Sequence, residues 1–71
     1  NPSKGIFNLS FGYQVELATV TVVNALGQVV KSEDVRNVSE MTIDLSKMSK
    51  GIYYLRLNAK VNSRIFKLIL E

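Results

Sequence analysis

Apolar and polar residues alternate along most of this 71-residue chain, and a period of two predicts β-strands. The clearest case follows Gly51, where Tyr53, Leu55 and Leu57 alternate with more polar neighbours across residues 52–58. Such a segment suits a strand with one buried and one wetter face. We therefore expect the rest of the chain to pack around this strand.

A short corner precedes that strand. Asp44 is expected to begin the turn, and Gly51 is expected to take a positive φ, which a residue without Cβ adopts easily. Leu45 and Met48 are spaced to place two apolar side chains on the core. Tyr53 lies where immunoglobulin-like sandwiches have a tyrosine corner, whose phenol bonds back to the corner's backbone. These features predict a small all-β sandwich.

Further strands are expected wherever the alternation returns. They are residues 6–11, 15–24, 28–32, 41–45 and 61–71. Residues 12–14 interrupt the pattern and are expected to turn the chain, and Gly27 is expected to close a hairpin loop in the left-handed conformation. Residues 33–40 are polar and unpatterned, so they contribute one weak strand or none. The sandwich then has about six to seven antiparallel strands.

Parity limits the register of the last hairpin, because a one-residue slip turns every buried side chain outward. Pairing Tyr53 with Leu68 and Leu55 with Phe66 keeps apolar groups together. Pairing Tyr53 with Leu70 and Leu55 with Leu68 has the same parity and a longer loop. We expect the first register.

Length and composition indicate one folded domain over residues 1–71. A domain of about 60 residues buries only about 60% of its unfolded surface, so the core is small, and no cysteine is present to support it. The apolar fraction of 46%, placed in alternation, excludes a disordered chain. The start at Asn1-Pro2, without an initiator Met or a signal-peptide pattern, suggests a piece of a longer chain.

The charges do not favour a nucleic-acid or membrane partner. Nine Lys and Arg against six Asp and Glu give a net charge of +3, and the cations are spread along the chain, whereas nucleic-acid surfaces cluster them. Lysines on outward strand positions commonly protect sheet edges from pairing. The longest apolar run, residues 65–70, is broken by Lys67 and falls far short of the roughly 20 residues of a membrane span.

The chain offers little for catalysis. It has no His and no Cys, which removes the usual metal ligands and most nucleophile and base arrangements. Glu33 and Asp34 are the only adjacent carboxylates, and neighbours on a strand point to opposite faces. The four glycines are too far apart for a phosphate-binding loop. We therefore expect no enzymatic activity, no metal and no cofactor.

Four segments, in their order and spacing, closely resemble the type A C-terminal sorting domain of the type IX (Por) secretion system. They are residues 1–5, 20–30, 43–57 and 66–70. The resemblance covers the whole chain. It implies a small immunoglobulin-like antiparallel β-sandwich that serves as an export address for an N-terminal cargo domain.

The motifs of that family fall on single positions of this chain. They are the Pro-x-x-Gly entry at Pro2 and Gly5, the Gly-Gln hairpin at Gly27 and Gln28, the Gly-x-Tyr corner at Gly51 and Tyr53, and the basic-apolar terminal strand at Lys67, Leu68, Ile69 and Leu70. One departure is that this chain ends on Glu71, whereas the family often ends close to a lysine or an apolar residue.

The resemblance also implies partners and a location. The type IX translocon and an outer-membrane shuttle barrel would recognise the domain, and a cell-surface sortase would remove it. The cargo would pass through the periplasm and reach the cell surface or the medium. An immunoglobulin- or fibronectin-like spacer, or a carbohydrate-binding module, is the alternative, and ligand binding at an internal position of the parent would distinguish it. A second alternative is a small basic β-barrel that binds single-stranded nucleic acid. It would show salt-sensitive binding to oligonucleotides.

A physical hypothesis accompanies the resemblance. The terminal strand is apolar on both faces, so one face can fill the core while Ile65, Ile69 and the strand's end meet a receptor, for example by strand addition. The recognition residues would then be Lys67, Leu68, Ile69, Leu70 and Glu71. The glycines and Tyr53 would build the scaffold that presents them.

Overall fold

The computed structural model describes residues 2–60 and 63–71, which form five strands and no helix. Two long strands, β2 (Ile6–Asn24) and β3 (Val29–Asp44), form one antiparallel hairpin. The strands β4 (Gly51–Ala59) and β5 (Arg64–Leu70) form a second hairpin, and β1 (Pro2–Ser3) is only two residues long. The sheet order is β1-β5-β4-β2-β3, in which only the β1–β5 pair is parallel.

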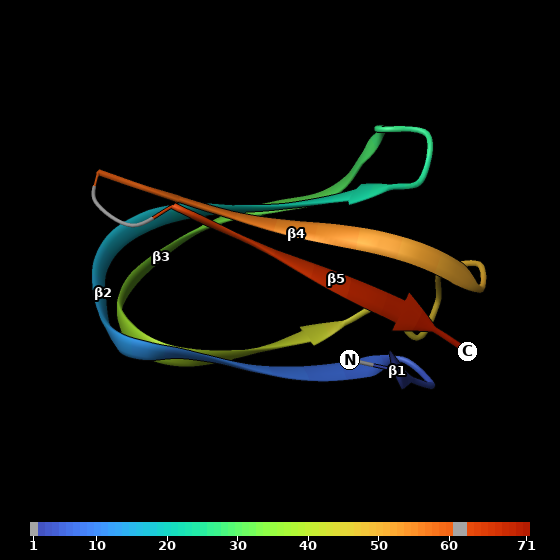
Figure 1. The fold of residues 1–71 in the computed structure, drawn as a ribbon, viewed down its shortest axis with the longest axis horizontal. Coiled ribbons are helices and arrows are strands. Elements are labelled where there is room, and N and C mark those ends of the chain that lie inside the picture. Colours follow the sequence, from blue (N-terminus) through green and yellow to red (C-terminus); the bar gives the residue numbers. More distant parts are fainter. Residues whose placement is uncertain (1, 61–62) are drawn as a thin grey trace.

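The long hairpin curls over the core. Figure 1 shows β2 and β3 bending together, so that the start of β2 runs below β4 and β5 while its end pairs beside β4. The β2–β3 register shifts between Ser10 and Val15, where β2 has extra residues and Gly12 has a φ of 81°. A bulge of this kind bends a strand and increases its twist. Residues 12–14 therefore bend β2, and the expected turn between two separate strands is not found.

The all-β prediction is confirmed, and the expected count is not. The described residues form one sheet of five strands, whereas six to seven strands in a sandwich were expected. Continuous pairing explains the difference, because residues 33–40 belong to the middle of β3 and pair with β2 on both sides of its bend. Their polar side chains suit an edge strand that faces solvent. The part of the chain that the structure describes has no helix able to cross a membrane.

The core lies inside the curl. Apolar side chains from the start of β2 face those from its end and from β4 and β5. This cluster includes Phe7, Leu9, Phe11, Val20, Val22, Leu55, Leu57 and Leu68. The predicted inward face of β4 is confirmed, because Tyr53, Leu55 and Leu57 are buried. No polar or charged side chain is buried among the described residues. Each fully buried Val, Leu or Phe side chain contributes about 1.5–3 kcal/mol to folding.

Two side chains, Met48 and Val23, are exceptions in their burial. Met48 was expected on the core but is 38% exposed, because the corner turns only Leu45 inward. Val23 is only 4% exposed, although it lies on the opposite face of β2 from the core residues Val20 and Val22. The register explains this burial, since Val23 lies between Tyr54 of β4 and Val29 of β3 on the outer face of the sheet.

The register of the last hairpin is as predicted. Tyr53 pairs with Leu68, and Leu55 pairs with Phe66. The described part of the terminal strand begins at Arg64, and the predicted start at Val61 lies outside the described residues. Residue 1 of the entry motif lies outside them as well.

Candidate functional site

The terminal strand β5 divides its side chains between the core and the surface. Leu68 and Leu70 are buried, so these two predicted recognition residues are core residues. Lys67 is exposed and Ile69 is half-buried on the opposite face, where Ile65 is 68% exposed. The alternation follows from the strand's period of two. Side chains available to a partner on this strand are therefore those of residues 65, 67 and 69.

The outer edge of β5 is covered only at its end. Pro2 pairs with Ile69 and Ser3 with Leu70, and the Glu71 N–H donates to the Ser3 carbonyl oxygen at 2.8 Å. Within residues 2–60 and 63–71, no strand pairs with this edge before Ile69. The sequence did not predict β1, because two residues show no alternation. Exposed Glu71 is thus held in place through its backbone.

Arg64 anchors the beginning of β5. Its guanidinium donates to the Phe11 carbonyl oxygen at 2.7 Å and lies 4.7 Å from the centre of the Phe66 ring. Phe66 in turn packs against the Phe11 ring, with 6.0 Å between centroids. A cation over a ring and a charged hydrogen bond both stabilise this arrangement. Sequence reasoning missed Arg64, because its partner lies far away in the chain.

The corner presents β4 as predicted. The Tyr53 hydroxyl donates to the Ser49 carbonyl oxygen at 2.6 Å, which confirms the tyrosine corner. A hydrogen bond of this type contributes about 0.5–1.5 kcal/mol. Gly51 has a φ of 150°, as the expected positive value requires. Both residues thus shape the corner that leads into β4.

Asp44 begins the corner by binding the backbone two residues ahead. Its Oδ1 accepts from the Ser46 hydroxyl at 2.6 Å and from the Ser46 N–H at 2.9 Å. These two bonds, with smaller help from the charges of Lys31 and Lys47, lower the pKa of Asp44 below its ordinary value of 3.8. The predicted role as a turn-starting residue is confirmed.

Acid should therefore weaken the corner. Because the folded-state pKa of Asp44 is lowered, its contribution to stability is present above pH 3.8 and is lost as the pH falls through the folded value. Urea unfolding of the wild type and of Asp44→Asn should show a lower midpoint for the variant at pH 7. The gap between them should close in acid. A gap of constant size across this range would contradict the assignment.

Gly5 joins the entry motif to the corner. Its carbonyl oxygen accepts from the Leu45 N–H at 2.7 Å, and a Cβ built on it would lie 2.7 Å from the Cβ of Ser46. Ser3 supports this turn, because its hydroxyl donates to the Ile6 carbonyl oxygen and accepts from the Gly5 N–H. The sequence placed Gly5 in the entry motif but did not indicate its contact with the corner.

Asn24 organises the hairpin between β2 and β3. Its Oδ1 accepts from the N–H groups of Leu26 and Gln28, and its Nδ2 donates to the Gln28 side chain at 2.9 Å. Gly27 has the predicted left-handed φ of 84°. Gly27 and Gln28 thus lie in the turn that Asn24 organises. Asn24 was not singled out beforehand, although Asn is typical of such turns.

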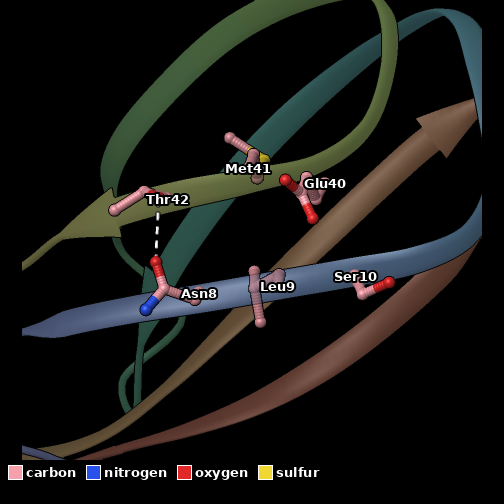
Figure 2. A pocket seen from close by; sticks show the side chains of 6 residues that line it. All are labelled: Asn8, Leu9, Ser10, Glu40, Met41 and Thr42. Carbon is pink, nitrogen blue, oxygen red and sulfur yellow. Dashed lines mark hydrogen bonds between the residues drawn. The ribbon is translucent and has the colours of Figure 1, made fainter.

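Surface hollows border β2 among the described residues. Figure 2 shows one of them between the start of β2 and the end of β3, where Asn8 and Thr42 face each other. The Thr42 hydroxyl donates to the Asn8 side chain at 2.9 Å, and Glu40 is the only titratable residue in the lining. No group of acidic residues that could hold a metal occurs among the described residues.

Two comparisons with known proteins bear on this site. A family model described as a secretion system C-terminal sorting domain matches residues 1–71. The match thus includes the entry motif, the corner and the terminal strand. A search of curated proteins finds no match.

Proposed function

Because this chain belongs to the family of secretion system C-terminal sorting domains, we propose that β5 is the element through which the export machinery recognises it. The family indicates a type IX sorting signal, which marks a secreted cargo protein for the cell surface or the extracellular space. It is not a family of enzymes. The chain's role is therefore to direct another protein.

One observation carries the proposal about β5. The strand is fixed in the sheet by Leu68 and Leu70, yet it leaves Ile65 largely exposed beside Lys67. Single exposed apolar residues are common, but an exposed isoleucine on a strand with a partly open edge is suited to contact with another protein. We assign presentation to Leu68 and Leu70, and contact to Lys67, Ile69 and Glu71.

The proposed route follows from family membership. The cargo passes through the periplasm, its sorting domain is recognised by the type IX translocon and received by an outer-membrane shuttle barrel, and a cell-surface sortase then removes it. The curled sheet supports an immunoglobulin-like arrangement as the scaffold, because its two ends enclose one core. Nothing in this scheme requires a cofactor.

The test is export of a fluorescent carrier fused to residues 1–71, in a bacterium with an intact type IX system and in a strain without the translocon. Wild-type export should depend on the translocon. Ile65→Glu should lower secreted fluorescence about tenfold or more, which corresponds to about 1.4 kcal/mol of lost recognition. The substitution leaves the core untouched, since Ile65 is 68% exposed.

Leu17→Glu is the matched control. Leu17 is 58% exposed on β2, and the substitution changes size and charge in the same way. Its export should match the wild type, and protease resistance of each fusion would verify folding. Equal export of both variants, or export without the translocon, would contradict recognition through β5.

A further inference from the structure

Acidic residues are unevenly distributed along the chain, whereas basic residues occur on both edges of the sheet. The stretch from residue 45 to residue 70 contains no Asp or Glu. Its cations are Lys47, Lys50, Arg56, Lys60, Arg64 and Lys67. By contrast, β3 at the other edge carries four carboxylates beside its two cations, Lys31 and Arg36; they are Glu33, Asp34, Glu40 and Asp44. The net charge of +3 therefore conceals a basic side formed by β4 and β5.

The outward side chains of β4 and β5 form one mixed surface. The register places Ile52 beside Ile69, Tyr54 beside Lys67, and Arg56 beside Ile65. We call this surface the hairpin face, and it consists of those six residues. Ile52, Tyr54 and Ile65 are all exposed. The face thus combines apolar area with positive charge and contains no carboxylate.

The two cations of the hairpin face are Arg56 and Lys67. Among the described residues, neither Arg56 nor Lys67 has a hydrogen bond or an ion pair through its side chain. Arg64, on the inner face of the same strand, is instead engaged with Phe11 and Phe66. Arg56 and Lys67 can therefore bind an external anion without breaking an internal contact.

We propose that the hairpin face docks onto an apolar protein surface of the export machinery that carries carboxylates, with Arg56 and Lys67 pairing with those carboxylates. This inference rests on the proposed function and names the chemistry of the partner. Complementary charges raise the association rate and exclude wrong partners, while the buried apolar area supplies affinity.

The charge pattern favours this partner over two others. An anionic lipid surface gains about 1 kcal/mol per nearby Lys or Arg, so the two cations of the face would give only weak adsorption. A second copy of the chain would have to offer the carboxylates of β3. In each copy, Asp34 accepts a hydrogen bond from its own Thr19, and Asp44 accepts one from its own Ser46. Two carboxylates of its acidic edge are thus already engaged within the domain.

A charge series at Arg56 in the full cargo fusion tests the proposal. Export should fall about tenfold in Arg56→Glu, fall less in Arg56→Gln, and stay within about twofold of the wild type in Arg56→Lys. Arg36→Glu on β3 is the matched control, because it removes the same charge from an exposed strand position. Equal losses at positions 36 and 56 would overturn the proposal, since net charge alone would then explain them.

The partner is identified by a photo-crosslinking phenylalanine analogue at position 54 of the fusion during export. The expected product joins the domain to a component of the machinery, at a segment with Asp or Glu. A crosslink only to lipid, or only to another copy of the domain, would overturn the proposal. The same analogue at position 17 should give none of the expected product.

The two proposals fail in different ways. If Ile65→Glu and Arg56→Glu are both exported like the wild type, recognition through β5 is wrong, and the acidic partner is wrong with it. If Ile65→Glu blocks export and Arg56→Glu does not, recognition through β5 stands and only the acidic partner is excluded.

Discussion

Gly5→Ala should unfold most of the domain, whereas Gly51→Ala should leave it folded but weakened. Both glycines have nearly the same backbone conformation, with φ of 151° and 150°. An L-residue there is strained by about 1–3 kcal/mol. The two sites differ in space, because a Cβ at Gly5 would lie 2.7 Å from the Ser46 Cβ and 2.8 Å from its Cα, whereas one at Gly51 meets nothing within 4 Å.

The clash at Gly5 adds an overpacking cost of about 1–3 kcal/mol. A core of this size provides only about 3–5 kcal/mol of net stability, so the sum of strain and clash removes most of it. Urea unfolding of the two alanine variants measures the difference directly, since the backbone cost is shared. Equal midpoints would show that the approach of Gly5 to Ser46 is not important. Gly51→Val should likewise act on folding, through backbone strain alone.

Removing residues 67–71 should abolish cooperative folding. The deletion takes Leu68 and Leu70 from the core, and each buried leucine contributes about 1.5–3 kcal/mol. It also removes the pairing partner of β1 and four of the seven residue pairs between β4 and β5. A loss of export in this truncation would therefore report unfolding as well as lost recognition, which is why surface substitutions on β5 are the sharper test.

Circular dichroism and thermal unfolding check the truncation. Removing Glu71 alone is the control, because it costs one hydrogen bond to Ser3, worth about 0.5–1.5 kcal/mol. The control should unfold cooperatively close to the wild type. A sharp unfolding transition in the chain of residues 1–66 would contradict the assignment of Leu68 and Leu70 to the core.

Much of the fold could be predicted because strand alternation is local. The side chains that face the core, the pairing of Tyr53 with Leu68 and the tyrosine corner all follow from parity and a few short-range rules. The continuity of β2 and β3 could not be predicted. A bulge interrupts alternation as a turn does, and only the pairing partner decides which of them forms.

The candidate site was predicted less completely. Lys67 and Ile69 lie on the surface as expected, but Leu68 and Leu70 are buried, because a strand that fills a core cannot present both faces. Arg64 was missed since its acceptor, the Phe11 carbonyl oxygen, is chosen by tertiary packing. The segregation of acidic residues was visible in the sequence, yet counting cations alone concealed it.

Parallel pairing of β1 with β5 gives the domain a shear geometry under mechanical load. A pull on the N-terminal end of β1 and an opposing pull on the C-terminal end of β5 would act along the two paired strands in opposite directions. Bonds such as that between Glu71 and Ser3 lie across this line of force, so they share the tension instead of opening in sequence. If the export machinery holds β5 as we propose, this pairing would resist tension applied at the N-terminal end of β1.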